Sequence, residues 1–110
     1  MVEQNDDLGV QQPLPKLTVR FEGELDLSRI DELDGALTPA SKLSGVELNV
    51  DLTAVTFMDS TVIGWLNRAQ AEVRRCNGRM RVVAARDSTL VKLLSLTGLH
   101  DEFEVDLLSG

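Results

Sequence analysis

Residues 45–52, Gly-Val-Glu-Leu-Asn-Val-Asp-Leu, alternate strictly between apolar and polar side chains after the glycine. Alternation of this kind has the period of a β-strand, in which successive side chains point to opposite faces of a sheet. A parallel strand buried on both faces would be apolar throughout. The pattern therefore predicts a sheet with one face covered and the other at least partly open to water.

Other strands and helices can be predicted on both sides of this segment. Segments with a strand pattern are 17–23, 24–27, 45–52, 79–85 and 103–105. Segments with apolar residues at helical spacing begin at Ser28, Ser60 and Ser88 and end near Pro39, Asn77 and Gly98. The order β-β-α-β-α-β-α-β predicts an α/β fold with helices mainly on one face. The sheet is expected to be mixed, because 17–23 and 24–27 are close enough to pair antiparallel.

The chain of 110 residues has the size of one domain. Residues 1–16 contain acidic residues, two prolines and a Gln-Gln pair with little periodicity, so we expect a flexible N-terminal tail. Residues 17–110 then form the folded domain.

Charge and composition exclude several classes of function. The net charge of −7 argues against a protein that binds nucleic acid directly, because such proteins carry a basic surface. No apolar run approaches the ~20 residues that span a bilayer, so membrane insertion is not expected. The acidic N-terminus is unlike a signal peptide, and a single cysteine suits a reducing compartment. We expect a cytoplasmic protein.

The sequence offers little that could catalyse a reaction. Cys76 occupies an apolar position of a predicted helix and His100 follows a helix end, and these two residues cannot build a zinc site alone. The sequence has no Gly-rich phosphate loop and no Gly-x-Ser-x-Gly elbow. Three aspartates could in principle hold a metal or act as acid and base: Asp26, Asp51 and Asp59. A small enzyme remains an alternative, but we expect neither enzymatic activity nor a cofactor.

The helix predicted from Ser60 has two contrasting faces. One is an apolar stripe of Val62, Leu66, Ala69, Val73 and Cys76, with Trp65 on its flank. The other is a row of small or polar residues, Ser60, Gly64, Asn67 and Ala71, with Arg68 and Arg75 alongside. Such a row would let the backbone of another protein come close, although it can also arise by chance. The predicted flank position of Trp65 suggests that its fluorescence reports docking.

Asp59-Ser60 at the start of this helix has two interpretations. Either residue is a common helix N-cap. Alternatively, Ser60 is a serine that carries a phosphate, which free backbone N–H groups and the helix dipole would stabilise.

Four segments together resemble the STAS domain, and more narrowly the single-domain bacterial anti-sigma-factor antagonists. They are Gly23-Glu-Leu-Asp-Leu27, Val50-Asp-Leu52, Val55-Thr-Phe-Met-Asp-Ser-Thr61 and Leu96-Thr-Gly-Leu99. The resemblance covers roughly residues 17–106. It implies a protein that binds an anti-sigma factor, itself a serine kinase, so that a sigma factor is released to RNA polymerase during a stress response. The kinase would phosphorylate the serine of the Asp-Ser motif and block binding, and a PP2C-type phosphatase would reverse this.

The resemblance assigns the phosphorylation to Ser60, with Thr61 as a second candidate acceptor, and places Asp26 beside the serine loop. The family commonly reads Asp-Ser-Ser-Gly-Leu-Gly, whereas Val62 stands here in place of the first glycine. The residues expected to bind the partner are Asp26, Met58, Asp59, Ser60, Thr61, Gly64, Asn67, Arg68 and Ala71. The alternative within the same fold is a binding module that is never phosphorylated, such as a stressosome-like scaffold or a lipid-transport accessory subunit.

Overall fold

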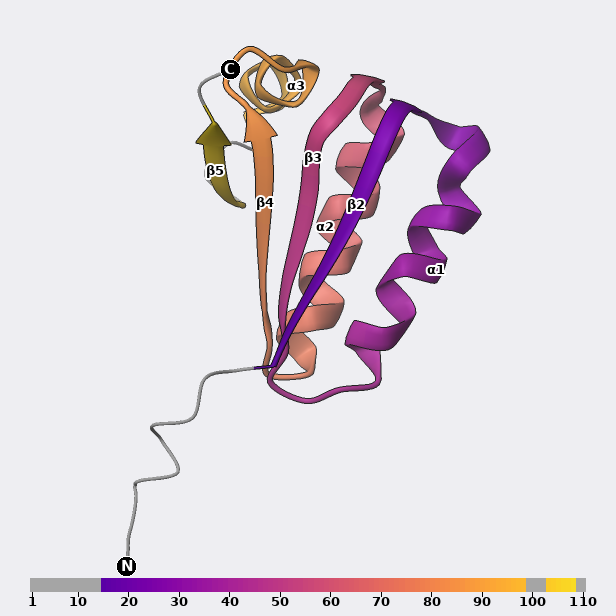
Figure 1. Ribbon diagram of the computed structural model, residues 1–110, viewed down its shortest axis with the longest axis vertical. Coiled ribbons are helices and arrows are strands. Elements are labelled where there is room, and N and C mark those ends of the chain that lie inside the picture. The colour runs from indigo at the N-terminus through magenta and orange to yellow at the C-terminus, as the bar shows by residue number, and fades with distance from the viewer. Residues whose placement is uncertain (1–14, 99–102, 109–110) are drawn as a thin grey trace, which may run out of the picture.

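The chain folds around a four-stranded parallel sheet, which a computed structural model describes together with its helices for residues 15–98 and 103–108. The elements are β2 (Lys16–Leu25), the 3-10 turn η2 (Leu27–Arg29), α1 (Ile30–Ser41), β3 (Glu47–Met58), α2 (Ser60–Arg75), β4 (Arg79–Ala85), α3 (Thr89–Thr97) and β5 (Glu104–Leu108). The strands lie in the order β2-β3-β4-β5. Figure 1 shows α1 and α2 side by side along the sheet, with α3 at the end where β3 and β4 finish. The predicted α/β class is confirmed.

One face of the sheet is buried, as the alternation in residues 45–52 predicts. The inward-facing side chains of residues 46–52, which lead into and begin β3, are at most 2% exposed: Val46, Leu48, Val50 and Leu52. The side chains between them are only partly buried. Burying a Leu or Val side chain stabilises a fold by roughly 1.5–3 kcal/mol, so this alternation determines which face receives the helices.

The prediction of two short strands in 17–27 is wrong. Residues Lys16–Leu25 form the single strand β2, which pairs parallel with β3 along its length. The pairing shifts register on both sides of Gly23, whose φ of +73° accommodates the irregularity without the strain that a side chain would add. The chain leaves the sheet at Asp26, and the pairings of the described strands are all parallel rather than mixed.

The end of α2 follows the prediction closely. The helix ends at Arg75, and Asn77 adopts the left-handed conformation with φ of 63°. Asn77 N–H donates to the Arg74 carbonyl at 3.0 Å, and Gly78 N–H donates to the Val73 carbonyl at 2.8 Å. These two bonds form a Schellman motif, which satisfies the last carbonyls of the helix and turns the chain toward β4.

Two of the other helix ends agree with the prediction and one differs. Gly98 ends α3 in the left-handed conformation with φ of 73°, as predicted. Ser28 does not cap α1, because η2 intervenes and Asp26 is its N-cap residue. Pro39 lies within the last turn of α1, which continues to Ser41.

Some predictions concern residues outside the described part of the chain. These are the tail up to residue 14, the last residue of the Leu96-Thr-Gly-Leu99 segment, and the placement of His100. Lys16, the last residue of the predicted tail, is the first residue of β2. Among the described helices, none combines the length and the apolar character that crossing a membrane requires.

Candidate functional site

The junction between β3 and α2 is built around Asp59. Its extended backbone makes it the N-cap residue of α2, and its carboxylate accepts a hydrogen bond from the Thr61 N–H at 2.9 Å. Ser60 is therefore the first helical residue rather than the cap. Its side chain is exposed and forms no hydrogen bond with any other residue that the structure describes. The cap interpretation applies to Asp59 and leaves the Ser60 hydroxyl accessible.

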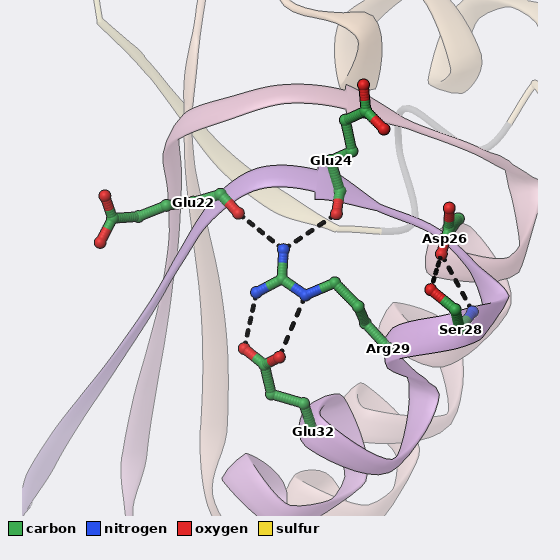
Figure 2. A network of polar contacts seen from close by, with 6 residues as sticks. All are labelled: Glu22, Glu24, Asp26, Ser28, Arg29 and Glu32. Atoms are coloured by element: carbon green, nitrogen blue, oxygen red, sulfur yellow. Dashed lines mark hydrogen bonds and ion pairs between the residues drawn. The ribbon is translucent and has the colours of Figure 1, made fainter.

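A second corner, between β2 and α1, is built around Asp26. Its Oδ1 accepts hydrogen bonds from the Ser28 N–H at 3.0 Å and from the Ser28 Oγ–H at 2.5 Å, as Figure 2 shows. The side-chain bond from Ser28 holds the pKa of the Asp26 carboxyl below its usual range. This corner therefore carries a fixed negative charge at neutral pH.

Arg29 ties the same corner to the sheet. Its Nη1 donates to the carbonyl oxygens of Glu22 at 2.6 Å and Glu24 at 2.9 Å, on β2. Its Nε and Nη2 bind the carboxylate of Glu32 at 3.0 and 2.7 Å. This one side chain thereby fixes the exit of β2 to the first turn of α1, and Figure 2 shows the guanidinium at the centre of the network.

The two corners lie next to each other. Leu25 and Met58 are register partners at the carboxyl ends of β2 and β3, and the Asp59 N–H donates to the Leu25 carbonyl at 3.3 Å. Asp26 follows the first of these strand ends, and Ser60 starts the helix after the second. The structure thus brings the Asp26 corner and the Ser60 loop together.

The residues of α2 that the helical spacing places opposite the apolar stripe are exposed, as predicted. Its exposed members are Ser60, Gly64, Asn67, Arg68 and Ala71. We call this set the small-residue face. The opposite stripe is buried, and Val62, Leu66, Ala69 and Val73 have no exposed surface. Cys76, which ends that stripe, is only half-buried at the C-cap.

Three side chains are more deeply buried than the sequence pattern indicates. Trp65 is only 1% exposed and packs edge-to-face against Phe21, with ring centroids 6.0 Å apart, so the side chain predicted at the flank of the apolar stripe is fully part of the core. Met58, predicted among the partner-binding residues, is 3% exposed and belongs to the hydrophobic core directly before Asp59. Gln70, which no prediction placed inside, is 5% exposed.

Two apolar side chains near the site are exposed although no sequence motif indicates this. Leu27 is 65% exposed and directly follows Asp26, while Phe57 is 48% exposed and lies two residues before Asp59. Both occupy positions that a strand pattern would assign to a sheet. Leu27 faces solvent because the chain leaves the sheet after Leu25 and Leu27 begins the turn η2.

A shallow groove of about 320 Å³ borders the small-residue face, on the side of α1. It is lined by Asp34, Leu37, Thr38, Arg68 and Glu72. Arg68 therefore belongs both to the groove and to the exposed face of α2.

The three aspartates of the enzyme hypothesis do not converge. Asp51 lies eight residues before Asp59 on β3, roughly 26 Å away along an extended strand. Its Oδ1 accepts from the Thr53 N–H at 2.9 Å and the Thr53 hydroxyl at 2.6 Å, and the hydroxyl bond lowers the Asp51 pKa. The described residues contain no cluster of three or more His, Cys, Asp or Glu that could hold a metal ion.

Comparison with known proteins agrees with this architecture. The family model of the STAS domain matches residues 2–108. The anti-sigma-B factor antagonist of Listeria monocytogenes is 31% identical over 80% of this chain and 76% of its own length. The protein of the same name from Staphylococcus aureus is 28% identical over 80% of this chain and 81% of its own length.

Among solved structures, the anti-sigma factor antagonist SpoIIAA in its unphosphorylated form matches with a TM-score of 0.64. The match covers 90% of this chain and 86% of that one at 15% identity, so it shows a shared fold alone. Because the family model spans nearly the whole sequence and relatives reach 31% identity over four fifths of it, this chain belongs to the STAS-domain family.

Proposed function

We propose that this chain is an anti-sigma-factor antagonist regulated by phosphorylation of Ser60. It binds an anti-sigma factor that is also a serine kinase, and the bound sigma factor is released. The kinase phosphorylates Ser60, which ends the interaction, and a PP2C-type phosphatase restores it. The observation that carries the proposal is the exposed Ser60 at the head of the small-residue face, in a chain whose relatives are named anti-sigma-B factor antagonists.

The small-residue face suits a partner that docks closely along α2. Gly64 has no side chain, Ala71 has a single methyl group, and both are exposed. A partner backbone or helix can approach such a face until main-chain atoms touch, which gives good packing for little loss of side-chain entropy. Asp26 and Asp59 would complete the site at its Ser60 end.

A phosphate on Ser60 would change this surface without unfolding the domain. It adds roughly −1.5 to −2 charges beside two carboxylates, those of Asp26 and Asp59. The N-terminus of α2 favours negative charge, so the helix tolerates the modification. Each ~1.4 kcal/mol of lost interaction weakens binding tenfold, so repulsion and volume at one position are enough to release the partner.

The replacement of a family glycine by Val62 leaves this mechanism intact. Val62 has no exposed surface, because it lies two residues from Ser60 and hence about 200° around the helix. Its added bulk fills the core, and the face that presents Ser60 and Gly64 stays free of it. The alternative of a binding module that is never phosphorylated rests on Val62 alone.

Two substitutions at Ser60 test the regulation. The binding partner is the anti-sigma factor kinase of the source bacterium, and its affinity is measured by isothermal titration calorimetry. Ser60→Ala should bind about as well as the unmodified protein, and Ser60→Asp should bind at least tenfold more weakly. Ser44→Asp is the matched control, because Ser44 is an exposed serine at the other end of α2, beside Cys76.

Equal affinity of Ser60→Ala and Ser60→Asp would favour the unregulated module. Mass spectrometry of the protein from its native cells, with and without stress, supplies the independent check. Phosphate at Ser60 whose occupancy changes with stress supports the switch. A chain that stays unmodified under every condition argues against it.

A further inference from the structure

Arg68 reaches back along α2 over Gly64. A Cβ atom placed on Gly64 would lie 3.8 Å from the Arg68 Nη1, which is ordinary van der Waals contact. Helical side chains lean toward the N-terminus of their helix, so the arginine covers the turn that precedes its own Cα. Its charge is thereby displaced one turn toward Ser60.

The charge on Arg68 is not neutralised within the described part of the chain. Its neighbour Glu72 forms an ion pair with Arg75, and no described carboxylate lies within ion-pair distance of Arg68. Asp34 and Glu72 line the same groove as Arg68 without forming an ion pair with it. The guanidinium can therefore turn toward a new anion at little cost.

We propose that Arg68 binds the phosphate of phosphorylated Ser60 across the gap left by Gly64. The inference rests on the proposed modification of Ser60 and adds the residue that receives it. Ser60 lies four residues before Gly64, about 6 Å along the helix axis, and Gly64 itself places no side chain between Ser60 and Arg68. Arginine offers parallel N–H donors in the geometry that phosphate oxygens accept.

Other charges near Ser60 leave this role to Arg68. Asp26 and Asp59 are acidic and repel a phosphate. Arg29 already donates to Glu32 and to two carbonyl oxygens of β2, so its donors are engaged. Among the five residues of the small-residue face, all of which the structure describes, Arg68 is the one with a cationic side chain.

The ion pair would explain how one phosphate at the end of the small-residue face blocks partner binding along its length. The phosphate and the guanidinium would meet above Gly64 and cover the position where a partner backbone comes closest. Phosphorylation would then fill the centre of the small-residue face as well as charging its end, with no change in the fold.

The test uses the full chain with phosphoserine incorporated at position 60 during translation, so it does not depend on any kinase. The second pKa of the phosphate, about 6 in an isolated phosphoserine, is measured by ³¹P NMR. Arg68→Gln should raise this pKa by about 0.2–0.7 unit, the shift expected from loss of an exposed ion pair. Arg74→Gln, which removes the same charge from an exposed position six residues further along α2, should leave it unchanged. The repulsion from Asp26 and Asp59 is common to all three proteins and cancels.

About 1 M NaCl should abolish the difference between the two variants, because the screening length falls to ~3 Å. A second readout is the Arg68 Nε–H resonance, which should shift when Ser60 carries phosphate while that of Arg74 does not. Equal pKa values in the Arg68→Gln and parent proteins, or an equal rise in both variants, would overturn the proposal. Either result would leave the regulation of partner binding by Ser60 to be decided separately by the affinity of Ser60→Asp.

Discussion

Replacing Gly64 with alanine should stabilise the protein and weaken its partner binding at the same time. Gly64 lies in the interior of α2, and its backbone has ordinary helical geometry. The nearest atom to an added Cβ is the Arg68 Nη1 at 3.8 Å, so the methyl group meets no obstacle in the free protein. Because glycine is about 0.8–1 kcal/mol less favourable than alanine inside a helix, Gly64→Ala should add roughly 0.5–1 kcal/mol to the free energy of unfolding.

Gly35 provides a matched control. It lies in α1, it is exposed, and an added Cβ would meet nothing within 4 Å. Gly35→Ala should therefore raise the unfolding free energy by a similar amount. For a domain of this size either substitution should raise Tm by about 2–6 °C, and Trp65 emission can follow the unfolding.

Only one of the two positions belongs to the small-residue face. If a partner packs its main chain against Gly64, an extra methyl group there overpacks the interface by about 1–3 kcal/mol. Gly64→Ala should then weaken the affinity for the anti-sigma factor roughly 5- to 150-fold, while Gly35→Ala leaves it unchanged. Unchanged affinity in both variants would refute close docking at Gly64. Destabilisation by Gly64→Ala would refute the helical propensity argument.

Three further outcomes follow from the packing and the charges. Because Trp65 is 1% exposed, partner binding should leave its emission maximum and acrylamide quenching unchanged, whereas urea unfolding should shift the emission to longer wavelength. Gly78→Ala should lower the free energy of unfolding, measured in urea, by roughly 1–3 kcal/mol, because the new Cβ would lie 2.4 Å from the Val46 carbonyl oxygen. A decrease of less than about 0.5 kcal/mol would contradict this clash. Arg79 binds the Glu104 carboxylate and holds its pKa below the usual range, so this pair stabilises the fold above the unfolded-state pKa and loses its effect as the pH falls through the folded-state pKa. The destabilisation by Arg79→Gln should accordingly shrink between about pH 7 and about pH 2, and a constant difference across that range would exclude the pair as its source.

The two-faced character of α2 could be predicted because it depends on the helical period alone. The burial of Trp65 could not be predicted from a single apolar stripe. Trp65 is offset from Ala69 by about 40° around the helix. Because α2 packs against α1 as well as against the sheet, it buries a wider arc than one neighbour would require, and that arc includes Trp65.

The sequence contains a signal that β2 is one continuous strand, although Gly23 interrupts its run of side chains. The apolar residues Leu17, Val19, Phe21 and Leu25 all occupy odd positions, so the alternation keeps its phase across the glycine. Because glycine commonly marks a turn, the local pattern is also compatible with two short strands close enough to pair antiparallel. Gly23 instead absorbs a register shift within one strand, which depends on the pairing with β3 and therefore cannot be seen locally.

The site itself divides in the same way between local and long-range causes. The Asp59 cap and the exposure of Ser60 follow from residues adjacent in sequence. The Arg29 network depends on two carbonyl oxygens of β2. Arg29 reaches them only when the chain turns back beside that strand to begin α1. Since that network fixes Asp26 next to the β3–α2 junction, the geometry around Ser60 depends on contacts that no motif in the sequence records.

In the segment 59–64, the helical period places residues that stabilise the fold and residues that would contact a partner on opposite faces of α2. Position 62 points into the core and position 64 points outward, although they are only two residues apart. A branched side chain at Val62 can therefore replace a smaller residue and contribute to packing without entering the partner surface. No such freedom exists at Gly64, where any side chain adds to the docking face even though the free protein has room for it. Departure from the family pattern is thus tolerated on the buried side of α2 and should be costly on the exposed side.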